Sequence, residues 1–356
     1  MVYKILFITK ILTHGGAQRV CASLANGLSL RGHEVSILAD FTIGKPYKTE
    51  EHVRLVQVDS YTNSGKFFKQ LNFLCKKEKY NIIINFEGLK TFYSVLAAKI
   101  NGIPIIYSEH NSFERPHSAP MPIYEYFKKY YLSRIYDCLT VLTKRDASLL
   151  KDKVSNVYIM PNPLFLSPLS EIPLKEKTIL AVGRLNAWHV KGFDVLMEAW
   201  SNIQHIYPDW TLKIVGGGEL EDKEFLMRLA KQKNVKRLKV IDYKSDIVEE
   251  YRNSEVFVLS SRYEGFGLVL IEALSQRCAC IACDYLGRQS EIIENEINGL
   301  TCQADSVNDL QSALFTVLGN EQLRKNIQLN SILGISKFSE ANVAERWELL
   351  IKKIVK

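Results

Sequence analysis

The stretch Tyr263-Glu264-Gly265-Phe266-Gly267-Leu268-Val269-Leu270-Ile271-Glu272-Ala273-Leu274 carries two carboxylates, Glu264 and Glu272, with seven residues between them. The apolar run Glu255-Val256-Phe257-Val258-Leu259-Ser260 before it predicts a buried strand, and the apolar pattern after Gly267 predicts a helix. We therefore expect Glu264 in a loop at the carboxyl end of a strand and Glu272 about one and a half turns into the helix. In open α/β sheets ligands bind at this edge, where glycines and a helix N-terminus suit a phosphate. We interpret the two carboxylates as acceptors for sugar or ribose hydroxyls; the alternative is a turn followed by a solvated helix face.

Composition indicates a globular protein of two domains. At 356 residues the chain is long for one core, and its 47% hydrophobic and 24% charged residues are typical of soluble proteins. We find no run of about 18 apolar residues, and the apolar stretch at the N-terminus is too short for a signal peptide and is interrupted by Lys10. We therefore expect a cytoplasmic protein.

The cysteines predict neither disulfides nor a metal site. Seven is an odd number in a long chain, which argues against a disulfide framework. Cys278, Cys280 and Cys283 resemble a metal cluster at first sight, but they lie in a short buried-strand pattern. No second Cys or His pair at zinc spacing accompanies them. We interpret them as small buried hydrophobes and expect no bound metal.

The net charge of +7 is concentrated in two segments that mix lysine with aromatic residues, 66–79 and 124–134. This pattern suits an amphipathic face in peripheral contact with an anionic membrane, here the inner face of the cell membrane. Nucleic acid is the competing partner, but no recognised nucleic-acid motif is present, so none is expected. The third interpretation is two ordinary surface helices.

Strand-like runs alternate with helical patterns along the chain, which predicts βαβ units and parallel sheets. The helical patterns include Ala17–Arg31, Asp194–Ile206 and Glu340–Lys356. The strand-like runs are Ile5–Thr9, Val35–Ala39, Asn81–Asn85, Ile103–Ser108, Cys138–Thr143 and Val157–Met160 in the first half, and Thr178–Val182, Thr211–Val215, Lys239–Ile241, Val256–Leu259 and Cys280–Ala282 in the second.

A proline-marked segment without periodicity, Pro161 to Pro173, separates the two series and predicts a linker. We expect a Rossmann-like domain over 1–163, a linker over 164–176 and a second Rossmann-like domain over 177–338. The final segment, 339–356, is expected to be a helix that packs back on the first domain.

In the first domain, the pair Gly15-Gly16 follows the first strand and opens a helix, where backbone N–H groups can meet a phosphate. A tight turn explains the pair equally well. The dinucleotide fingerprint is absent, which disfavours a nicotinamide cofactor. His110, in Ser108-Glu109-His110-Asn111, falls in a polar run at a strand end, which raises the odds of a functional over a structural histidine.

In the second domain, the first strand-to-helix connection carries Gly183-Arg184 and Lys191-Gly192. Arginine binds phosphate oxygens bidentately and lysine acts as a point charge, so this pair suits a diphosphate; the alternative is a solvated loop. Gly216, Gly217 and Gly218 end the next strand and allow another close backbone approach. Further on, Gly287 and Asn298-Gly299-Leu300 predict glycine turns.

Together these motifs resemble glycosyltransferase family 4 in order and spacing. The resemblance rests on Gly15-Gly16, Gly183-Arg184, Lys191-Gly192, Gly216–Gly218, the Glu264 and Glu272 pair, and Glu291-Ile292-Ile293 with Asn298-Gly299-Leu300. It covers nearly the whole chain and is more specific in the second half. It implies a GT-B architecture, in which two Rossmann-like domains face an interdomain cleft. The segments 15–20, 108–111 and 160–164 look most like bacterial enzymes that extend lipid-linked or surface glycans.

The resemblance implies a retaining, metal-independent hexosyltransferase without a cofactor. It would move a hexose or N-acetylhexosamine from a nucleotide-diphosphate sugar to a glycan acceptor that is expected to be lipid-linked, in polysaccharide or glycoconjugate biosynthesis. UDP is the expected nucleotide, and a guanosine donor stays open.

The resemblance also implies roles for individual residues. Arg184 and Lys191 would neutralise the leaving diphosphate, and Glu264 would accept from donor sugar hydroxyls rather than act as a nucleophile. Glu272 would hold the ribose, and His110 would lie near the sugar hydroxyls and the acceptor. The other donor-binding positions are Gly15, Gly16, Gly183, Gly216, Gly217, Gly265, Phe266, Gly267 and Leu268. One departure from the family pattern is the bulk of Trp188 and His189 between the two cations.

Two other classes of function remain open at this stage. A nucleotide-sugar epimerase or a phosphorylase on the same fold would need additional acid and base groups, or a pyridoxal lysine or phosphate pocket. An inactive partner or scaffold subunit would need no donor-side residues, and all the expected ones are present.

Overall fold

The computed structural model describes residues 1–355 except 14, 117–119 and 244–246. It divides into two compact units, each built on a parallel sheet. The first comprises Met1–Glu114, Met121–Pro163 and Lys337–Lys356, and the second comprises Arg115–Pro120 and Leu164–Ser336.

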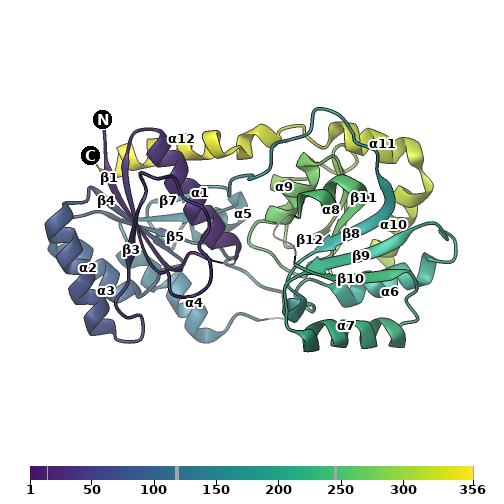
Figure 1. Cartoon of the computed structure of the whole chain (residues 1–356), viewed down its shortest axis with the longest axis horizontal. Helices are drawn as coiled ribbons and strands as arrows, with labels where there is room; N and C mark the ends of the chain where they lie inside the picture. Colours follow the sequence, from purple (N-terminus) through teal and green to yellow (C-terminus); the bar gives the residue numbers. More distant parts are fainter. Residues whose placement is uncertain (14, 117–119, 244–246, 356) are drawn as a thin grey trace. The chain divides into compact units, whose positions relative to one another are not determined.

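The first unit is a seven-stranded sheet with the strand order β3-β2-β1-β4-β5-β6-β7 (Figure 1). All its described strand pairs are parallel. Its elements are β1 (Lys4–Ile11), α1 (Gly16–Leu30), β2 (Glu34–Asp40), β3 (Arg54–Gln57), α2 (Ser64–Glu78), β4 (Ile82–Phe86), α3 (Thr91–Ile100), β5 (Ile105–Ser108), α4 (Ile123–Tyr130), β6 (Cys138–Val141), α5 (Lys144–Leu150), β7 (Val157–Ile159) and α12 (Glu340–Ile354).

The last helix, α12, packs against α1 in the first unit (Figure 1). Its buried side chains include Trp347 and Ile351, and Gly27 of α1 lies directly against Ala344. Arg31 Nε donates to Glu348 Oε2 at 2.6 Å beside this contact. The predicted helix over 340–356 is therefore present to Ile354, and Lys356 lies outside the described residues.

The second unit is a six-stranded parallel sheet with the order β10-β9-β8-β11-β12-β13. Its elements are β8 (Glu176–Val182), α6 (Phe193–Ile203), β9 (Thr211–Gly216), α7 (Leu220–Gln232), β10 (Leu238–Asp242), α8 (Val248–Asn253), β11 (Ser254–Leu259), α9 (Leu268–Ser275), β12 (Ala279–Asp284), β13 (Gly299–Gln303), α10 (Val307–Gly319) and α11 (Glu321–Asn330).

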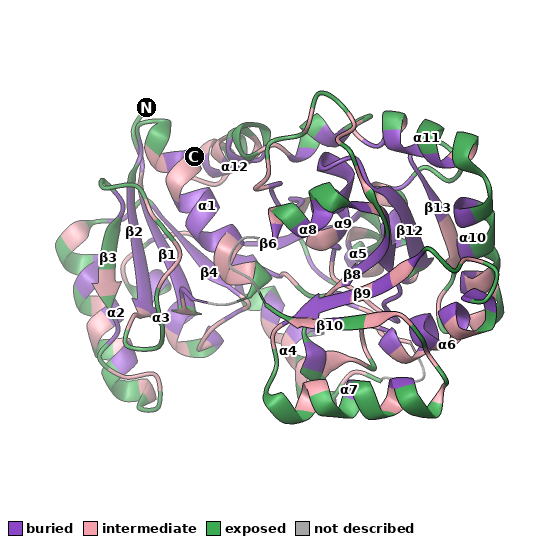
Figure 2. Cartoon of the chain, turned by 45° about the vertical axis from the view of Figure 1, so that its right-hand side comes forward, coloured by how far each residue is buried: buried purple, intermediate pink, exposed green. Residues whose placement is uncertain are grey.

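Burial follows from strand position in both sheets. The central strands are apolar and buried on both faces, as parallel strands covered by helices must be, whereas the edge strands β3 and β10 are partly exposed (Figure 2). Cys278, Cys280 and Cys283 are buried free thiols at and along β12. The predicted fold class, two α/β units with parallel sheets, is confirmed.

One predicted turn is wrong. Gly299 and Leu300 begin strand β13, which pairs in parallel with β12. A Cβ on Gly299 would lie 2.9 Å from the Cys280 carbonyl oxygen, so glycine is needed there for close strand contact and not for a turn.

The segment between the two sheets, 164–175, contains no helix or strand of its own and is bonded to the second unit. Arg277 donates from Nε to the Leu169 carbonyl at 2.9 Å and from Nη2 to the Ser170 carbonyl at 2.7 Å. Lys175 Nζ donates to backbone carbonyls that include those of Tyr251 and Gln276. Backbone carbonyls of this segment are thus hydrogen-bonded by side chains of the second unit instead of by a neighbouring strand.

Candidate active site

The connection after β8 places Lys191 against Glu264. Lys191 Nζ lies 2.5 Å from Glu264 Oε1, and both side chains are less than one-fifth exposed. The Lys191 stem lies along Gly183, where a Cβ would come within 3.0 Å of Cγ, so glycine makes room for the lysine. Arg184 is exposed, and no side-chain partner contacts it among the described residues. Two predicted site residues, Lys191 and Glu264, are therefore in contact. A third, Arg184, directly follows Gly183 in the sequence.

The ends of β8 and β9 approach each other as closely as backbone allows. A Cβ on Gly216 would lie 1.7 Å from the Gly183 carbonyl oxygen. Leu185 N donates to the Gly217 carbonyl at 2.7 Å, which ties the two loops together. A Cβ added at Gly217 would make only an ordinary van der Waals contact, with Tyr243 Cβ at 3.7 Å. Of these two glycines, Gly216 is therefore the one that the close packing of β8 and β9 requires.

The loop after β11 is shaped by Gly267 at the start of α9. Gly267 has φ of 99°, and a Cβ there would lie 2.8 Å from the Tyr285 hydroxyl, so other residues are disfavoured. The Tyr285 hydroxyl donates to the carbonyl of Phe266 at 2.9 Å, which fixes the turn between Gly265 and Leu268. Glu264 precedes this turn and accepts from Ser261 Oγ at 2.8 Å.

Glu272 lies on α9 and is buried. Its Oε2 accepts from the Tyr251 hydroxyl at 3.0 Å, and the residue is only 4% exposed. The sequence pattern places the carboxylate on the helix but does not reveal this tyrosine, which comes from α8.

Sequence reasoning missed Arg262, which holds the cation-bearing loop in place. Its guanidinium binds both oxygens of Asp194 at 2.8 and 2.9 Å and reaches Asp305 Oδ1 at 2.8 Å. Its backbone N–H donates to the Val190 carbonyl, and Ser260 Oγ donates to the Lys191 carbonyl. The bond to Asp194 raises the pKa of Arg262 despite its burial. Arg262 is therefore a positioning residue for Lys191.

The bulk of Trp188 is taken up by packing. Its ring lies 4.9 Å from that of Phe225 on α7, and it is half-buried against the core of the second unit. His189 beside it is exposed, and its carbonyl accepts from Arg262. The departure from the family pattern therefore leaves the Lys191–Glu264 contact intact.

In the first unit, the predicted residue His110 is held at both ring nitrogens. Its Nδ1 donates to Asn162 Oδ1 at 3.0 Å, because a carbonyl oxygen can only accept. Ser108 Oγ, which accepts from Thr140, donates to Nε2 at 3.0 Å. The ring stacks on Phe86 with 4.7 Å between centroids. Burial lowers the pKa of His110 to about 4. The imidazole is thus neutral and fixed in orientation.

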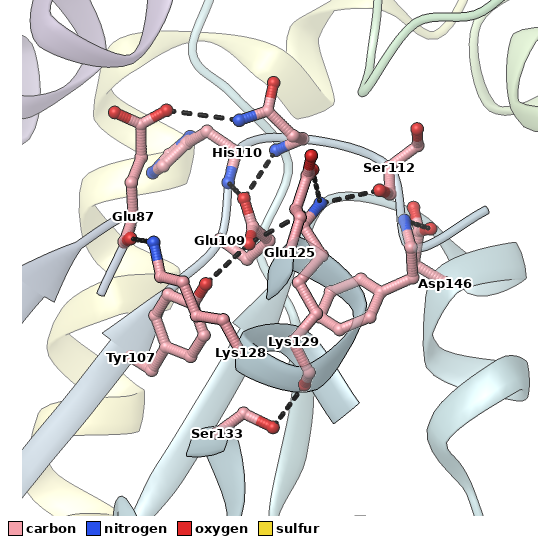
Figure 3. A network of polar contacts seen from close by, with 12 residues as sticks. Glu87, Tyr107, Glu109, His110, Ser112, Glu125, Lys128, Lys129, Ser133 and Asp146 are labelled. Carbon is pink, nitrogen blue, oxygen red and sulfur yellow. Dashed lines mark hydrogen bonds and ion pairs between the residues drawn. The ribbon is translucent and has the colours of Figure 1, made fainter. Parts of the chain in front are cut away.

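Beside His110 lies a buried ion pair that the sequence did not predict (Figure 3). Lys129 Nζ lies 3.6 Å from Glu109 and 3.5 Å from Glu125, and it donates to the Ser112 carbonyl at 2.7 Å. Glu109 accepts from the Tyr107 hydroxyl at 2.6 Å and from two backbone N–H groups. Burial raises the pKa of Glu109, but the charge of Lys129 and these hydrogen bonds outweigh it, and the pKa is lowered overall.

This pairing corrects one expectation about the segment 124–134. Lys129 is 2% exposed, so it does not belong to a basic surface. The exposed side chains of α4 include Tyr124 and Phe127, at 72% and 52%, and Ile123 at its start. The face of α4 is aromatic more than basic.

The loop at the end of β1 places Gly15 immediately before α1. Gly15 has φ of 117°, outside the range that other residues favour, and Gly16 is the first helical residue. Gly15 is the N-cap residue and makes no side-chain hydrogen bond to the helix start. Such a start is compatible with a bound anion.

Two α/β units, each built on a parallel sheet, are the fold of GT-B enzymes, and solved structures of that class superimpose on this chain. Residues 166–332 match the model for glycosyl transferases group 1, and residues 14–166 match that for Glycosyltransferase Family 4. The chain therefore belongs to the group 1 and family 4 glycosyltransferases.

Some known proteins are similar to this chain over nearly its whole length. A glycosyltransferase of Haemophilus influenzae is 29% identical, over 96% of this chain and 98% of that one. A Campylobacter jejuni enzyme, GalNAc-alpha-(1->4)-GalNAc-alpha-(1->3)-diNAcBac-PP-undecaprenol alpha-1,4-N-acetyl-D-galactosaminyltransferase, is 27% identical over 99% of both. The crystal structure of HepE from Anabaena in complex with UDP and glucose superimposes with a TM-score of 0.79 at 16% identity, over 99% of this chain and 100% of that one, and supports the fold. The protein is thus a glycosyltransferase.

Among the described residues, no helix has the length and apolar character needed to cross a bilayer. Within the same residues, no three His, Cys, Asp or Glu side chains gather as metal ligands.

Proposed function

We propose that the protein is a retaining, metal-independent hexosyltransferase. It moves a hexose or an N-acetylhexosamine from a UDP-sugar to a lipid-linked glycan. The observation that carries the proposal is the contact of Lys191 with Glu264, one short loop from the exposed Arg184 and next to the glycines of two strand ends. The UDP and glucose in the HepE complex support the choice of donor, and the undecaprenol-linked acceptor named for the Campylobacter relative supports the choice of acceptor.

The two cations act on the leaving group. In the proposed reaction the bond from the anomeric carbon to the diphosphate oxygen breaks, and negative charge grows on that oxygen. Lys191 and Arg184 stabilise this charge more in the transition state than in the ground state, which is the condition for catalysis. No resident metal is needed in this scheme because the two side chains supply the positive charge.

Glu264 orients both the lysine and the sugar. Its Oε1 holds Lys191 and accepts from Ser261, whereas Oε2 has no partner within the described part of the chain. We assign Oε2 to hydroxyl groups of the donor sugar and Glu272 on α9 to the ribose. Since Glu264 is bound to Lys191, we infer attack by the acceptor hydroxyl from the face that the diphosphate leaves. The proton of that hydroxyl goes to the diphosphate, and the anomeric configuration is retained.

The test is transfer from a panel of UDP- and GDP-sugars to α-N-acetylglucosaminyl and α-N-acetylgalactosaminyl diphospholipids. We expect turnover with one UDP-sugar and an anomeric proton in the product with the configuration of the donor. Epimer formation without acceptor, or an inverted product, would contradict the proposal.

The matching variant is Lys191→Met. We expect it to lower turnover about 10²- to 10³-fold, as loss of one charge-stabilising group does. Lys223→Met is the control, because Lys223 forms an exposed pair with Asp242 in the same unit. Equal activity of Lys191→Met and wild type would remove the assigned role.

We further propose peripheral contact of the first unit with an anionic membrane. Support comes from the exposed lysines of α2, which include Lys66 and Lys77, and from the exposed rings of α4. Aromatic side chains insert at a bilayer interface and lysines attract its charge. Co-sedimentation with vesicles of phosphatidylglycerol and phosphatidylcholine should weaken as salt rises and with Phe127→Ser. Absence of binding at low salt would contradict this part.

A further inference from the structure

The turn after β4 holds a strained glutamate at the first sheet's carboxyl edge. Glu87 has φ of 54°, in the left-handed region that residues other than glycine rarely adopt. Gly88 follows with φ of 59°. A Cβ on Gly88 would lie 3.0 Å from both Tyr107 and Thr91, so the turn is tightly packed. Lys128 Nζ donates to the Glu87 carbonyl and helps to hold it there (Figure 3). Strain of this kind persists where neighbours impose it, and it is concentrated at functional sites.

The turn directs the Glu87 carboxylate between two carboxamides. Its Oε1 accepts from Asn111 Nδ2 at 3.2 Å, and its Oε2 accepts from Gln18 Nε2 at 3.4 Å. Gln18 lies in the first turn of α1 and Asn111 follows β5, so the three residues come from separate loops. Asn111 is exposed, and the other two are half-buried. The Asn111 bond is at the long end of the normal range and the Gln18 bond is beyond it, so both are weak enough for a ligand to replace them.

The position of this trio in the sheet is that of a ligand site. β1 leads through α1 to β2 on one side, and β4 leads through α3 to β5 on the other. The strands β1 and β4 are neighbours, so the connections diverge between them. Ligands of open α/β sheets bind at this switch point, outside the carboxyl ends of the strands.

The charges around the trio favour a neutral ligand. Lys128 is bonded to the Glu87 carbonyl, and Lys129 lies between Glu109 and Glu125. A phosphate at this site would therefore be repelled by the Glu87 carboxylate, and the two neighbouring lysines are already engaged with other groups. A carboxylate flanked by amides instead offers acceptors and donors side by side, which matches adjacent hydroxyl groups of a sugar.

We infer that Glu87, Gln18 and Asn111 bind the hydroxyl groups of the terminal sugar of the acceptor, with Glu87 as the principal hydrogen-bond acceptor. This assignment rests on the proposed function, since it names the acceptor's part of it. The lipid diphosphate of the acceptor lies elsewhere, because the carboxylate repels it.

The test is saturation-transfer NMR with the methyl α-glycosides of glucose, galactose, N-acetylglucosamine and N-acetylgalactosamine, in the presence of UDP. We expect saturation transfer to at least one glycoside with the wild type and a loss of about tenfold in affinity with Glu87→Gln. Gln18→Ala should also lower the affinity for the same glycoside. Glu51→Gln, at an exposed position of the same unit, is the control. Circular dichroism and the unfolding midpoint report whether the variants fold.

The outcomes separate the two proposals. Failure of UDP to bind the wild type, measured by thermal shift in the same samples, overturns the proposed function. Binding of UDP without saturation transfer to any glycoside, or with transfer that Glu87→Gln leaves unchanged, overturns the assignment of Glu87 alone. Binding of inorganic phosphate that Glu87→Gln strengthens and a glycoside does not displace would also overturn it.

Discussion

Replacement of Gly216 by alanine tests whether the β8 and β9 ends must touch for the enzyme to hold its donor. The new Cβ would lie 1.7 Å from the Gly183 carbonyl oxygen and 2.8 Å from its carbon. A tolerable C···O contact is about 3.3 Å, so the two strand ends must separate by about 1.6 Å. That movement displaces the loop that carries Arg184 and Lys191.

The size of the effect follows from this separation. Overpacking of a core costs about 1–3 kcal/mol. For a unit of about 150–250 residues, Tm falls by about 2–4 °C per kcal/mol, so we expect a decrease of about 2–12 °C. A misplacement of about 1 Å at reacting groups costs about 10²-fold in rate, and turnover should fall by at least that factor.

The assay combines scanning calorimetry, titration with UDP and turnover. Gly217→Ala is the matched comparison for stability, because its Cβ would make only an ordinary 3.7 Å contact with Tyr243. We expect its Tm to stay within about 2 °C of the wild type, since substitutions free of such clashes change stability by at most about 0.5 kcal/mol. If Gly216→Ala melts and turns over like the wild type, or if both variants lose the same stability, the argument from close approach is wrong.

The remaining predictions concern residues that hold the site. Arg262→Lys should lose the bidentate bond to Asp194, destabilise by about 1.5–3 kcal/mol and raise the donor KM about tenfold; an unchanged donor KM would contradict a positioning role. His110 should stay neutral from pH 8 to 5, because its pKa is lowered to about 4, and a ring signal that titrates near pH 6.5 in nitrogen-detected NMR would contradict this. Since the unfolded chain takes up this proton below about pH 6.5 and the folded chain only near 4, His110 should lower the free energy of unfolding as the pH falls through that window. His110→Gln should remove that part of the pH slope in urea titrations.

The sequence predicted the central strands within one or two residues because they are continuous apolar runs. It missed β3, whose residues Arg54–Gln57 are mostly exposed at a sheet edge and carry no such run. It misassigned Gly299, because a glycine that permits close strand packing looks the same in the sequence as a glycine in a turn. Local pattern thus predicts strands with an apolar run and misses β3, an exposed strand that has none.

The candidate site was predictable where its residues lie in short glycine-containing motifs, as Lys191 and Glu264 do. It was not predictable where the contact joins distant segments. Arg262 binds Asp194 and Asp305, which are far from it in sequence, and no spacing rule connects them. Glu87 is marked only by its backbone conformation, and nothing in Phe86-Glu87-Gly88 beyond the glycine indicates a left-handed glutamate.

The packing of α12 on α1 has a consequence for the folding of the chain during its synthesis on the ribosome. The first unit requires residues 337–355 to cover α1, yet 173 residues of the second unit, Leu164–Ser336, are synthesised in between. At about 5–20 residues per second, this interval lasts roughly 10–35 s. During it, the side of α1 that later meets Ala344 lacks its contact with α12. The first unit therefore becomes native only once α12 has been synthesised, which is after the second unit's residues Leu164–Ser336.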